Sequence, residues 1–536
     1  MATSPELDAW DPLNSPSAPD LHWMTVNAGE AIPGVQTPLS WTFWERTCEL
    51  TTRAPSHRIG AMTRAESQMP ASVDGRLVRV FYGRAAIQVA VLRLLGDRLP
   101  GTTGPEAIRH VLGRVPEDIE FHPTRRRYPI VAAKLPWLYL TVPRALPKVN
   151  REYEMWRRAS LPRIPNLNRP ALAELMGEAR RRHEYGVLLQ TDVLFVAVQP
   201  MFDALSRLVE DAGVGDLSIL SGSGGAEMAV VADIWRASRG QIGVETVAEN
   251  HGFHGHREGE LSSRVWREDD RPLRQMIEQY AERDESEAPA LAQADAERRR
   301  VEQTQAVLAA LPRGKRSGAR ILMAQAHRKI PLRGVVKRAF LGAFDVGRAA
   351  ARQTGKLLAD EGVLERPDDV FFLTFQELTG AVPPNAAELA TLRRERHATY
   401  RGLTLPVDWR GEPTPIPLSE HEDGAAAGKA LSGIGVSGGT VEGVVHVVQD
   451  PATAEIQQDE ILVAPITDPS WSSVMFISSA LVVDVGGALS HAAVVARELE
   501  VPCVVNTGNG STALRTGDRV RVDGDAGTVE VLERAT

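Results

Sequence analysis

The sequence predicts an α+β protein with several domains, in which a mainly α-helical region precedes a smaller C-terminal domain that contains strands. Its 536 residues are enough for two or three domains with buried cores. Over much of residues 76–380, apolar residues recur three and four positions apart, which is the spacing of amphipathic helices. Residues 517–524 instead alternate apolar and polar side chains and end in Asp-Gly, which indicates a β-hairpin.

Two irregular stretches come before the helical region. Residues 1–20 are polar and rich in Pro, Ser and Asp, so we expect a flexible tail that lacks the features of a signal peptide. Residues 23–40 are interrupted by Gly and Pro and cannot form one regular helix. Helical spacing then appears in residues 85–95, 171–182, 189–209 and 301–311, and residues 330–361 predict a long helical pair.

The domain limits follow from changes in composition. Residues 407–429 contain several Pro, Gly and Ala residues and predict a linker. We therefore expect a tail at 1–20, a mainly helical domain at 21–406, a linker at 407–430 and a C-terminal domain at 431–536.

Composition and charge narrow the classes of function. A net charge of −8 and a pI near 6.0 argue against a nucleic-acid-binding surface, and the basic runs at 125–127 and 298–300 fit solvated faces. The two cysteines, Cys48 and Cys503, do not indicate a disulfide framework and fit a reducing compartment. The most apolar run, 187–198, is too short to span a bilayer. We expect a soluble cytoplasmic protein whose partners are neither nucleic acid nor membrane.

One histidine of the C-terminal domain has the surroundings of a reactive residue. His491 follows Gly486, Gly487 and Ser490 and begins an Ala-rich helical run that reaches residue 499. The glycines allow a tight turn, and Ser490 is a good N-cap. The N–H groups and the dipole of a helix start favour a bound phosphate and disfavour imidazolium. A neutral imidazole is a nucleophile at cellular pH, although the same histidine could simply cap or pack the helix.

Two other groups of residues are candidates for chemistry. Arg333 and Lys337 stand four apart and share one helix face, where they could hold the oxygens of a transferring phosphoryl group or form a solvated basic face. The Gly-rich segment 251–261 contains three histidines and two acids. Their order does not match a zinc pattern, so we predict no metal site there.

The segment 251–261 offers proton-transfer groups instead. Residues 261–269, which follow directly, resemble the substrate domain of rifampicin phosphotransferase. This resemblance implies that either His254 or His256 is a candidate general base for an acceptor hydroxyl. Glu258 and Glu260 are candidates for substrate binding or for the same proton transfer.

Residues 431–532 resemble the phosphohistidine swivelling domain of phosphoenolpyruvate synthase, pyruvate phosphate dikinase and rifampicin phosphotransferase. The resemblance is carried by Leu431-Ser432-Gly433, Ser437-Gly438-Gly439, Ala464-Pro465-Ile466-Thr467-Asp468-Pro469, Val483-Asp484, Val501-Pro502-Cys503-Val504-Val505 and the segment from Gly517 to Gly524. It implies a β/β/α domain in which the histidine at position 491 carries phosphate between two distant active sites, supported by Gly486, Gly487 and Ser490.

Residues 23–40 and 261–269 are similar to the substrate domain of rifampicin phosphotransferase, which implies that the helical domain binds the acceptor. Asn27 and Glu30 would then contact substrate or phosphohistidine, although they could equally tie down an irregular loop. Gly334 stands where related phosphotransferases commonly have Glu, and this departure puts transfer in doubt. Trp41, Trp44 and Phe253 are either pocket or core residues.

The resemblance implies a divided enzyme. It covers nearly all of this chain but does not include the ATP-grasp domain of a complete enzyme. We therefore expect ATP and Mg²⁺ to act through a separate ATP-grasp subunit that phosphorylates His491, and a small molecule with a hydroxyl to accept the phosphoryl group. Two alternatives stay open: a binding or regulatory protein without catalysis, and an enzyme that uses the pocket for dehydration or condensation through a transient phosphate.

Overall fold

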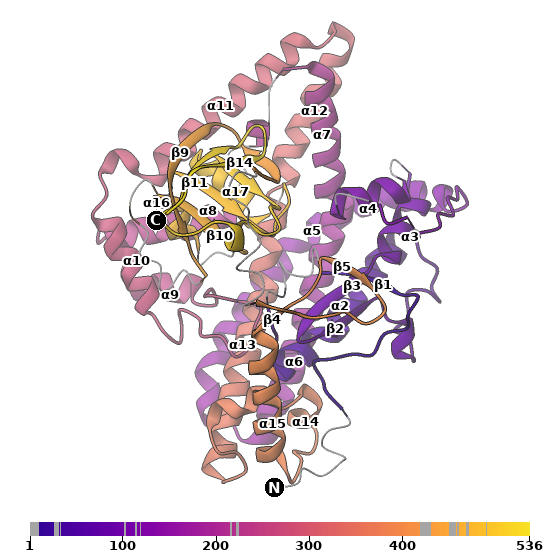
Figure 1. Cartoon of the computed structure of the whole chain (residues 1–536), viewed down its shortest axis with the longest axis vertical. Helices are drawn as coiled ribbons and strands as arrows, with labels where there is room; N and C mark the ends of the chain where they lie inside the picture. The colour runs from indigo at the N-terminus through magenta and orange to yellow at the C-terminus, as the bar shows by residue number, and fades with distance from the viewer. Residues whose placement is uncertain are drawn as a thin grey trace. The chain divides into compact units, whose positions relative to one another are not determined.

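The computed structural model of the chain forms two compact units (Figure 1). It describes residues 10–25, 32, 34–100, 103–112, 115–117, 119–214, 217–220, 225–418, 430–449, 457, 460–467, 471–488 and 490–535. Unit 1 consists of Met1–Val196, Gly259–Ser262 and Val336–Glu420, and unit 2 of Ala197–Glu258, Ser263–Val335 and His421–Thr536. Part of the helical region thus groups with the C-terminal domain, and the expected domain limits stay a prediction.

Unit 1 is built from long helices and a small sheet. Its helices are α2 (Pro38–Ile59), α3 (Ala90–Arg98), α4 (Gly104–Leu112), α5 (Tyr128–Ser160), α6 (Arg169–Val193), α14 (Phe375–Thr379), α15 (Ala386–Arg401) and most of α13 (Leu332–Asp360). Its strands are β1 (His22–Met24), β2 (Val78–Phe81), β3 (Arg84–Gln88), β4 (Leu403–Thr404), β5 (Asp408–Arg410) and β6 (Ile416–Pro417). The predicted helix over 171–182 is confirmed. The helical pair expected over 330–361 is instead one continuous helix, α13.

A tight hairpin joins β2 to β3 in the antiparallel sheet β2-β3-β1-β5. Tyr82 and Gly83 form its two-residue loop, with φ angles of 47° and 74°. Loops in which both residues have positive φ match the twist of paired strands. The predicted helix over 85–95 is therefore wrong in its first half, because β3 pairs with both β2 and β1 before α3 begins at Ala90.

Two segments expected to be loose are packed in unit 1. Leu13, in the predicted tail, is 1% exposed, and its carbonyl accepts a hydrogen bond from the Gly83 N–H at 2.8 Å. Trp409, in the predicted linker, is buried on β5 and pairs with Trp23 of β1. The tail prediction fails for residues 10–20, and the linker prediction fails for β5, because these segments bury apolar side chains in the sheet core.

Aromatic side chains form the centre of the helical part of unit 1. Phe43 and Trp44 of α2 contact His183 of α6, with ring centroids 5.3 and 4.2 Å apart. Phe344 of α13 packs edge-on against Phe43 at 5.3 Å. These rings come from three helices distant in sequence, so they hold α2, α6 and α13 together.

Unit 2 combines a helical part with an eight-stranded sheet. Its helices are α7 (Gln199–Ala212), α8 (Gly225–Ser238), α9 (Val244–His251), α10 (Arg271–Ala281), α11 (Pro289–Ala310), α12 (Arg313–Lys329), α16 (Ser472–Ile477), α17 (His491–Leu499) and α18 (Gly510–Ala513). Its strands are β7 (Leu431–Ser432), β8 (Ile434–Ser437), β9 (Thr440–Val447), β10 (Ile461–Ala464), β11 (Ala480–Val483), β12 (Cys503–Val505), β13 (Arg519–Asp523) and β14 (Thr528–Glu533).

The sheet of unit 2 has parallel strands at its centre. The strand order is β7-β14-β13-β9-β10-β11-β12-β8, and the neighbouring strands from β9 to β12 pair in parallel. Leu481 and Val483 of β11 pack with α16 and α17, whereas Ala480 and Val482 pack with β13 and β14. Successive side chains of a strand point to opposite faces. The alternation therefore produces the predicted β/β/α arrangement, and the β13–β14 pairing confirms the predicted hairpin.

Two sequence expectations concern cysteine and membranes. Cys48 and Cys503 are free thiols, and Cys503 is buried on β12. One helical stretch, Arg169–Ala212, is long and apolar enough to cross a bilayer, and 44% of its apolar window is buried within the protein. Core helices of globular proteins meet the same criterion, so the stretch does not by itself indicate a membrane span.

Candidate functional site

His491 is the first residue of α17, as the sequence predicts. The Ser490 side chain is the N-cap and accepts a hydrogen bond from the Ala493 N–H at 3.3 Å. Ala492 and Ala493 are buried against the sheet, while His491 is 8% exposed. The first amides of a helix lack acceptors within the helix, so a partly accessible histidine here lies beside groups that favour an anion.

The two glycines before the cap lie at a tight turn, as the sequence predicts, because the Ser490 N–H donates a hydrogen bond to the Gly487 carbonyl at 2.9 Å. Neither Gly486 nor Gly487 has a positive φ, so their role is not a left-handed turn. A Cβ at Gly486 would lie 3.0 Å from the Ser490 Oγ, whereas a Cβ at Gly487 would meet no atom within 4 Å. Gly486 therefore makes room for the N-cap, and Gly487 borders open space near the helix start.

The carboxyl ends of three neighbouring parallel strands surround this helix start. Thr467 follows β10, Asp484 follows β11 directly, and Thr507 follows β12. The Oγ1 of Thr467 lies 3.4 Å from the Nδ1 of His491. Ligands of parallel sheets bind at this edge because the turns there present backbone and side-chain polar groups together.

Asp484 fixes the turns at this edge. Its carboxylate accepts hydrogen bonds from the Thr507 hydroxyl at 2.8 Å, from the Ser511 N–H at 3.1 Å and from the Ser511 hydroxyl. Burial raises the pKa of Asp484, and the hydrogen bonds from Ser511 and Thr507 oppose that rise. These donors lie after β12 and in α18. Asp484 therefore ties the end of β11 to both segments, and it is a positioning group for the edge that carries His491.

Arg497 is a second positioning group, which the sequence analysis missed. It is buried on α17 and donates hydrogen bonds to the Ala488 carbonyl at 2.9 Å and to the Val436 carbonyl at 3.2 Å. Burial and, to a smaller extent, the nearby positive charge of Arg333 together lower its pKa to about 10. The position of Arg497, six residues after His491, does not by itself predict this contact. The contact depends on how α17 folds back toward the segment before it.

Arg333 and Lys337 occupy successive turns at the start of α13, which confirms that they share a helix. Both side chains are half-buried, and the intervening Gly334 is buried. Arg333 lies in unit 2, close enough to Arg497 to affect its pKa. The structure thus brings Arg333 toward the α17 region. Lys337 belongs to unit 1.

The histidine-rich segment after α9 is a packed structure. The Nδ1 of His254 lies 2.7 Å from a carboxylate oxygen of Glu258, and both residues are buried. The His254 ring also contacts Phe253 and Trp266, with centroids 4.3 and 5.9 Å away. A Cβ at Gly255 would lie 2.7 Å from the Arg264 carbonyl oxygen, so this glycine permits a close backbone approach. His254 is a shielded histidine with an acidic partner, whereas His256 is half-buried.

Glu260 has a structural role that differs from the predicted one. One carboxylate oxygen accepts from the hydroxyls of Thr37 and Ser40 at 2.7 and 2.6 Å and from the Ser262 N–H at 2.9 Å. The other accepts from the Thr37 N–H at 3.0 Å. Glu260 is 1% exposed. These bonds tie the 259–262 segment to the start of α2, where a carboxylate also stabilises the helix dipole.

The other predicted site residues divide into two groups. Asn27 and Glu30 lie outside the described residues. Trp41, Trp44 and Phe253 are at most 4% exposed, which identifies them as core residues. Over the described part of the chain, no three His, Cys, Asp or Glu side chains gather where they could hold a metal ion.

Two regions match models of known protein families. Residues 456–527, which include Gly486, Gly487, Ser490, His491 and Arg497, match the PEP-utilising enzyme mobile domain. Residues 239–334, which contain the segment after α9 and end just after Arg333, match the rifampicin phosphotransferase fourth domain. The resemblance stated from the sequence is confirmed in these two regions.

Several curated proteins are similar to part of the chain. Rifampicin phosphotransferase from Streptomyces sviceus is 34% identical over 234 residues, which cover 42% of this chain and 26% of that protein. Rifampicin phosphotransferase from Bacillus subtilis is 31% identical over 209 residues, 38% of this chain and 23% of that protein. An uncharacterized protein of Mycobacterium bovis is 37% identical over 211 residues, 39% and 24% of the two chains. The chain thus spans about a quarter of the length of these relatives.

Among solved structures, aconitase X from Thermococcus kodakaraensis is 27% identical over a match that covers 20% of this chain and 100% of that chain. The TM-score is 0.16, which is too low to compare the folds.

Proposed function

We propose that this chain is a phosphotransferase component of the PEP-utilising type, in which His491 carries a phosphoryl group to a hydroxyl of a small organic acceptor. The observation that carries the proposal is the placement of His491 on the N-terminus of α17, at the carboxyl edge of parallel strands, within the mobile-domain match. The names of the relatives support the class of reaction.

The proposed reaction has two steps. We assign Nε2 of His491 as the nucleophile, because Nδ1 faces the Thr467 hydroxyl. A bond forms from Nε2 to phosphorus while the bond from phosphorus to the donor's leaving oxygen breaks. The acceptor oxygen then attacks phosphorus, the N–P bond breaks, and the hydroxyl proton passes to a base.

Other residues of the chain would support transfer without reacting. The first amides of α17 hold the phosphate oxygens, and Gly487 leaves space beside them. Arg333 and Lys337 supply positive charge, which phosphoryl transfer needs more than covalent assistance. His254 or His256 takes the acceptor proton, and Asn27 contacts the acceptor.

The proposal assigns ATP and Mg²⁺ to an ATP-grasp module on a separate cytoplasmic subunit. The protein is mixed with Mg²⁺, radiolabelled ATP and a candidate ATP-grasp partner, and acid-labile label on the chain is measured. We expect label on the wild type and on His446→Gln, a matched control in the same sheet whose side chain faces Glu460. Label that survives in His491→Ala, or no label beside a demonstrably active partner, would refute the carrier role.

Two glycine variants test the proposed phosphate position. Gly487→Ala should fold normally, because its new methyl group meets no atom within 4 Å, but it should slow labelling by filling the phosphate space. Gly486→Ala should instead weaken the Ser490 cap and lower thermal stability. If Gly487→Ala is labelled at the normal rate, the phosphate does not occupy the space beside Gly487.

Product analysis then separates the proposed kinase from its alternatives. A phosphorylated acceptor that accumulates identifies a kinase. A dehydrated or condensed product shows that the phosphate is transient, and label that never leaves His491 indicates a binding or regulatory protein. Arg333→Ala should retain labelling but transfer more slowly, since it acts on the moving phosphoryl group.

A further inference from the structure

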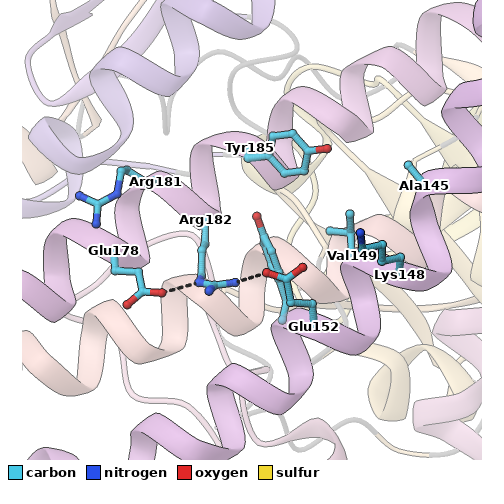
Figure 2. Close-up of a pocket in the computed structure, with 9 residues that line it drawn as sticks. Ala145, Lys148, Val149, Glu152, Glu178, Arg181, Arg182 and Tyr185 are labelled. Carbon is cyan, nitrogen blue, oxygen red and sulfur yellow. Dashed lines mark hydrogen bonds and ion pairs between the residues drawn. The ribbon is translucent and has the colours of Figure 1, made fainter.

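A groove of about 620 Å³ lies between α5 and α6 in unit 1 (Figure 2). Its residues stand at positions 145, 148, 149, 152 and 153 of α5 and 178, 181, 182 and 185 of α6. Both sets follow the three- and four-residue spacing of one helix face. The groove thus belongs to two facing helices of a single unit, and its volume is in the range of small-molecule pockets.

An ion-pair network forms part of the groove. Arg182 donates to Glu178 of its own helix at 2.9 Å and to Glu152 of α5 at 3.2 Å, which Figure 2 marks with dashed lines. The Arg182 guanidinium also lies 5.1 Å from the centre of the Tyr153 ring. Arg182 therefore links the two helices, and it binds both carboxylates that line the groove, Glu152 and Glu178.

Two further cations line the groove without an acidic partner. Lys148 and Arg181 are exposed, and neither forms an ion pair with any residue in the described part of the chain. Three cationic side chains against two carboxylates leave the groove with one excess positive charge. Because the carboxylates already bind Arg182, the charges of Lys148 and Arg181 remain for an anion from outside.

Aromatic and aliphatic surface accompanies these charges. Tyr185 is 48% exposed, and Figure 2 shows its ring near Ala145 and Val149. Tyr153 is buried, and its burial raises the pKa of the phenol above its usual value. The groove therefore offers flat apolar surface beside free positive charge.

We propose that this groove binds a small organic anion that carries an aromatic ring. The ring packs against Tyr185 and Val149, and the anionic group binds Lys148, which Figure 2 shows beside Val149. Arg181 lies on the other side of Arg182 and contributes only its positive charge. None of the predicted phosphotransfer residues lines the groove. A test of this proposal is therefore independent of the role of His491.

Binding of 1-anilinonaphthalene-8-sulfonate, a fluorescent aromatic anion, tests the proposal on the full chain. The uncharged analogue N-phenyl-1-naphthylamine has the same rings without the sulfonate. Lys148→Met should weaken binding of the anion about tenfold, as expected for one charge-assisted contact, and Arg181→Met should weaken it less. Both variants should leave binding of the neutral probe within about twofold of the wild type. Tyr185→Ala should weaken binding of both probes, because it removes the aromatic ring against which they pack.

Arg151→Met is the matched control, because Arg151 is an exposed cation of α5 that does not line the groove. It should bind both probes like the wild type. The proposal is overturned if Lys148→Met does not weaken binding of the anion. It is also overturned if Arg151→Met weakens the anion as much, since binding would then follow overall charge. The variants concern exposed side chains, and their circular dichroism should match the wild type.

Discussion

His183 should give the stability of unit 1 a specific dependence on pH. The side chain is fully buried on α6, where the rings of Phe43, Trp44, Phe340 and Phe344 surround it. Neither ring nitrogen has a hydrogen-bond partner among the described residues. Burial lowers the pKa of His183 from 6.5 to about 3, because the imidazolium would lose its hydration with no acceptor to replace it.

The direction of the effect follows from proton binding. Between about pH 3 and pH 6.5, the unfolded chain binds a proton at His183 that the folded chain does not bind. Stability is therefore unaffected above pH 6.5 and is lost as the pH falls through this window. From pH 7 to pH 5, a group with these two pKa values lowers the free energy of unfolding by about 2 kcal/mol, at 1.36 kcal/mol per pKa unit.

The variant His183→Leu removes the titrating group and keeps an apolar side chain in the cluster. Urea unfolding is measured at pH 5, 6 and 7, and hydrogen exchange of α6 peptides assigns the transition of unit 1. Between pH 7 and pH 5, the free energy of unfolding should fall by about 2 kcal/mol more for the wild type than for His183→Leu. The control His122→Gln changes a side chain that is 70% exposed and should follow the wild type. Equal losses for wild type and His183→Leu would refute the reasoning.

Two further predictions concern buried charges. Arg497→Met should lower the free energy of unfolding of unit 2 by about 3 kcal/mol and speed hydrogen exchange of the turn before His491, because two carbonyl groups lose their donor. The control Arg519→Met, at an exposed arginine, should change the free energy of unfolding by less than about 1 kcal/mol. Equal effects of the two variants would contradict the positioning role of Arg497. Glu260→Gln should cost about 2 kcal/mol in thermal unfolding, because an amide cannot accept from every donor around Glu260, whereas Glu361→Gln at the surface should be nearly neutral. Unchanged stability with a large loss of turnover would instead make Glu260 a reacting group.

The sequence was informative where local pattern is sufficient. Ser490 before an Ala-rich run predicted the start of α17, and the alternation in residues 517–524 predicted a strand of the β13–β14 hairpin. Helical spacing predicted α6 and α13 for the same reason, since cap geometry and side-chain period depend on residues close in the chain.

Local pattern failed where distant segments decide the structure. Residues 84–88 have a helix-compatible spacing, but pairing on both sides makes them β3. The glycines before His491 predicted the tight turn, but the sequence did not show that a side chain at Gly486 would crowd the Ser490 hydroxyl. The sequence made Glu260 a candidate base, but it did not show that the hydroxyls of Thr37 and Ser40 donate to the Glu260 carboxylate.

The sequence by itself determined that His491 begins a helix and that the chain resembles phosphotransferases in its C-terminal part. Only the tertiary structure placed Thr467 beside the imidazole, Arg497 against the preceding turn and Asp484 between neighbouring loops. It also left Lys148 and Arg181 beside a groove whose carboxylates already bind Arg182. The physical reason is that charge pairing and burial depend on which surfaces meet after the chain has folded, whereas helix starts and side-chain periods depend on neighbours along it.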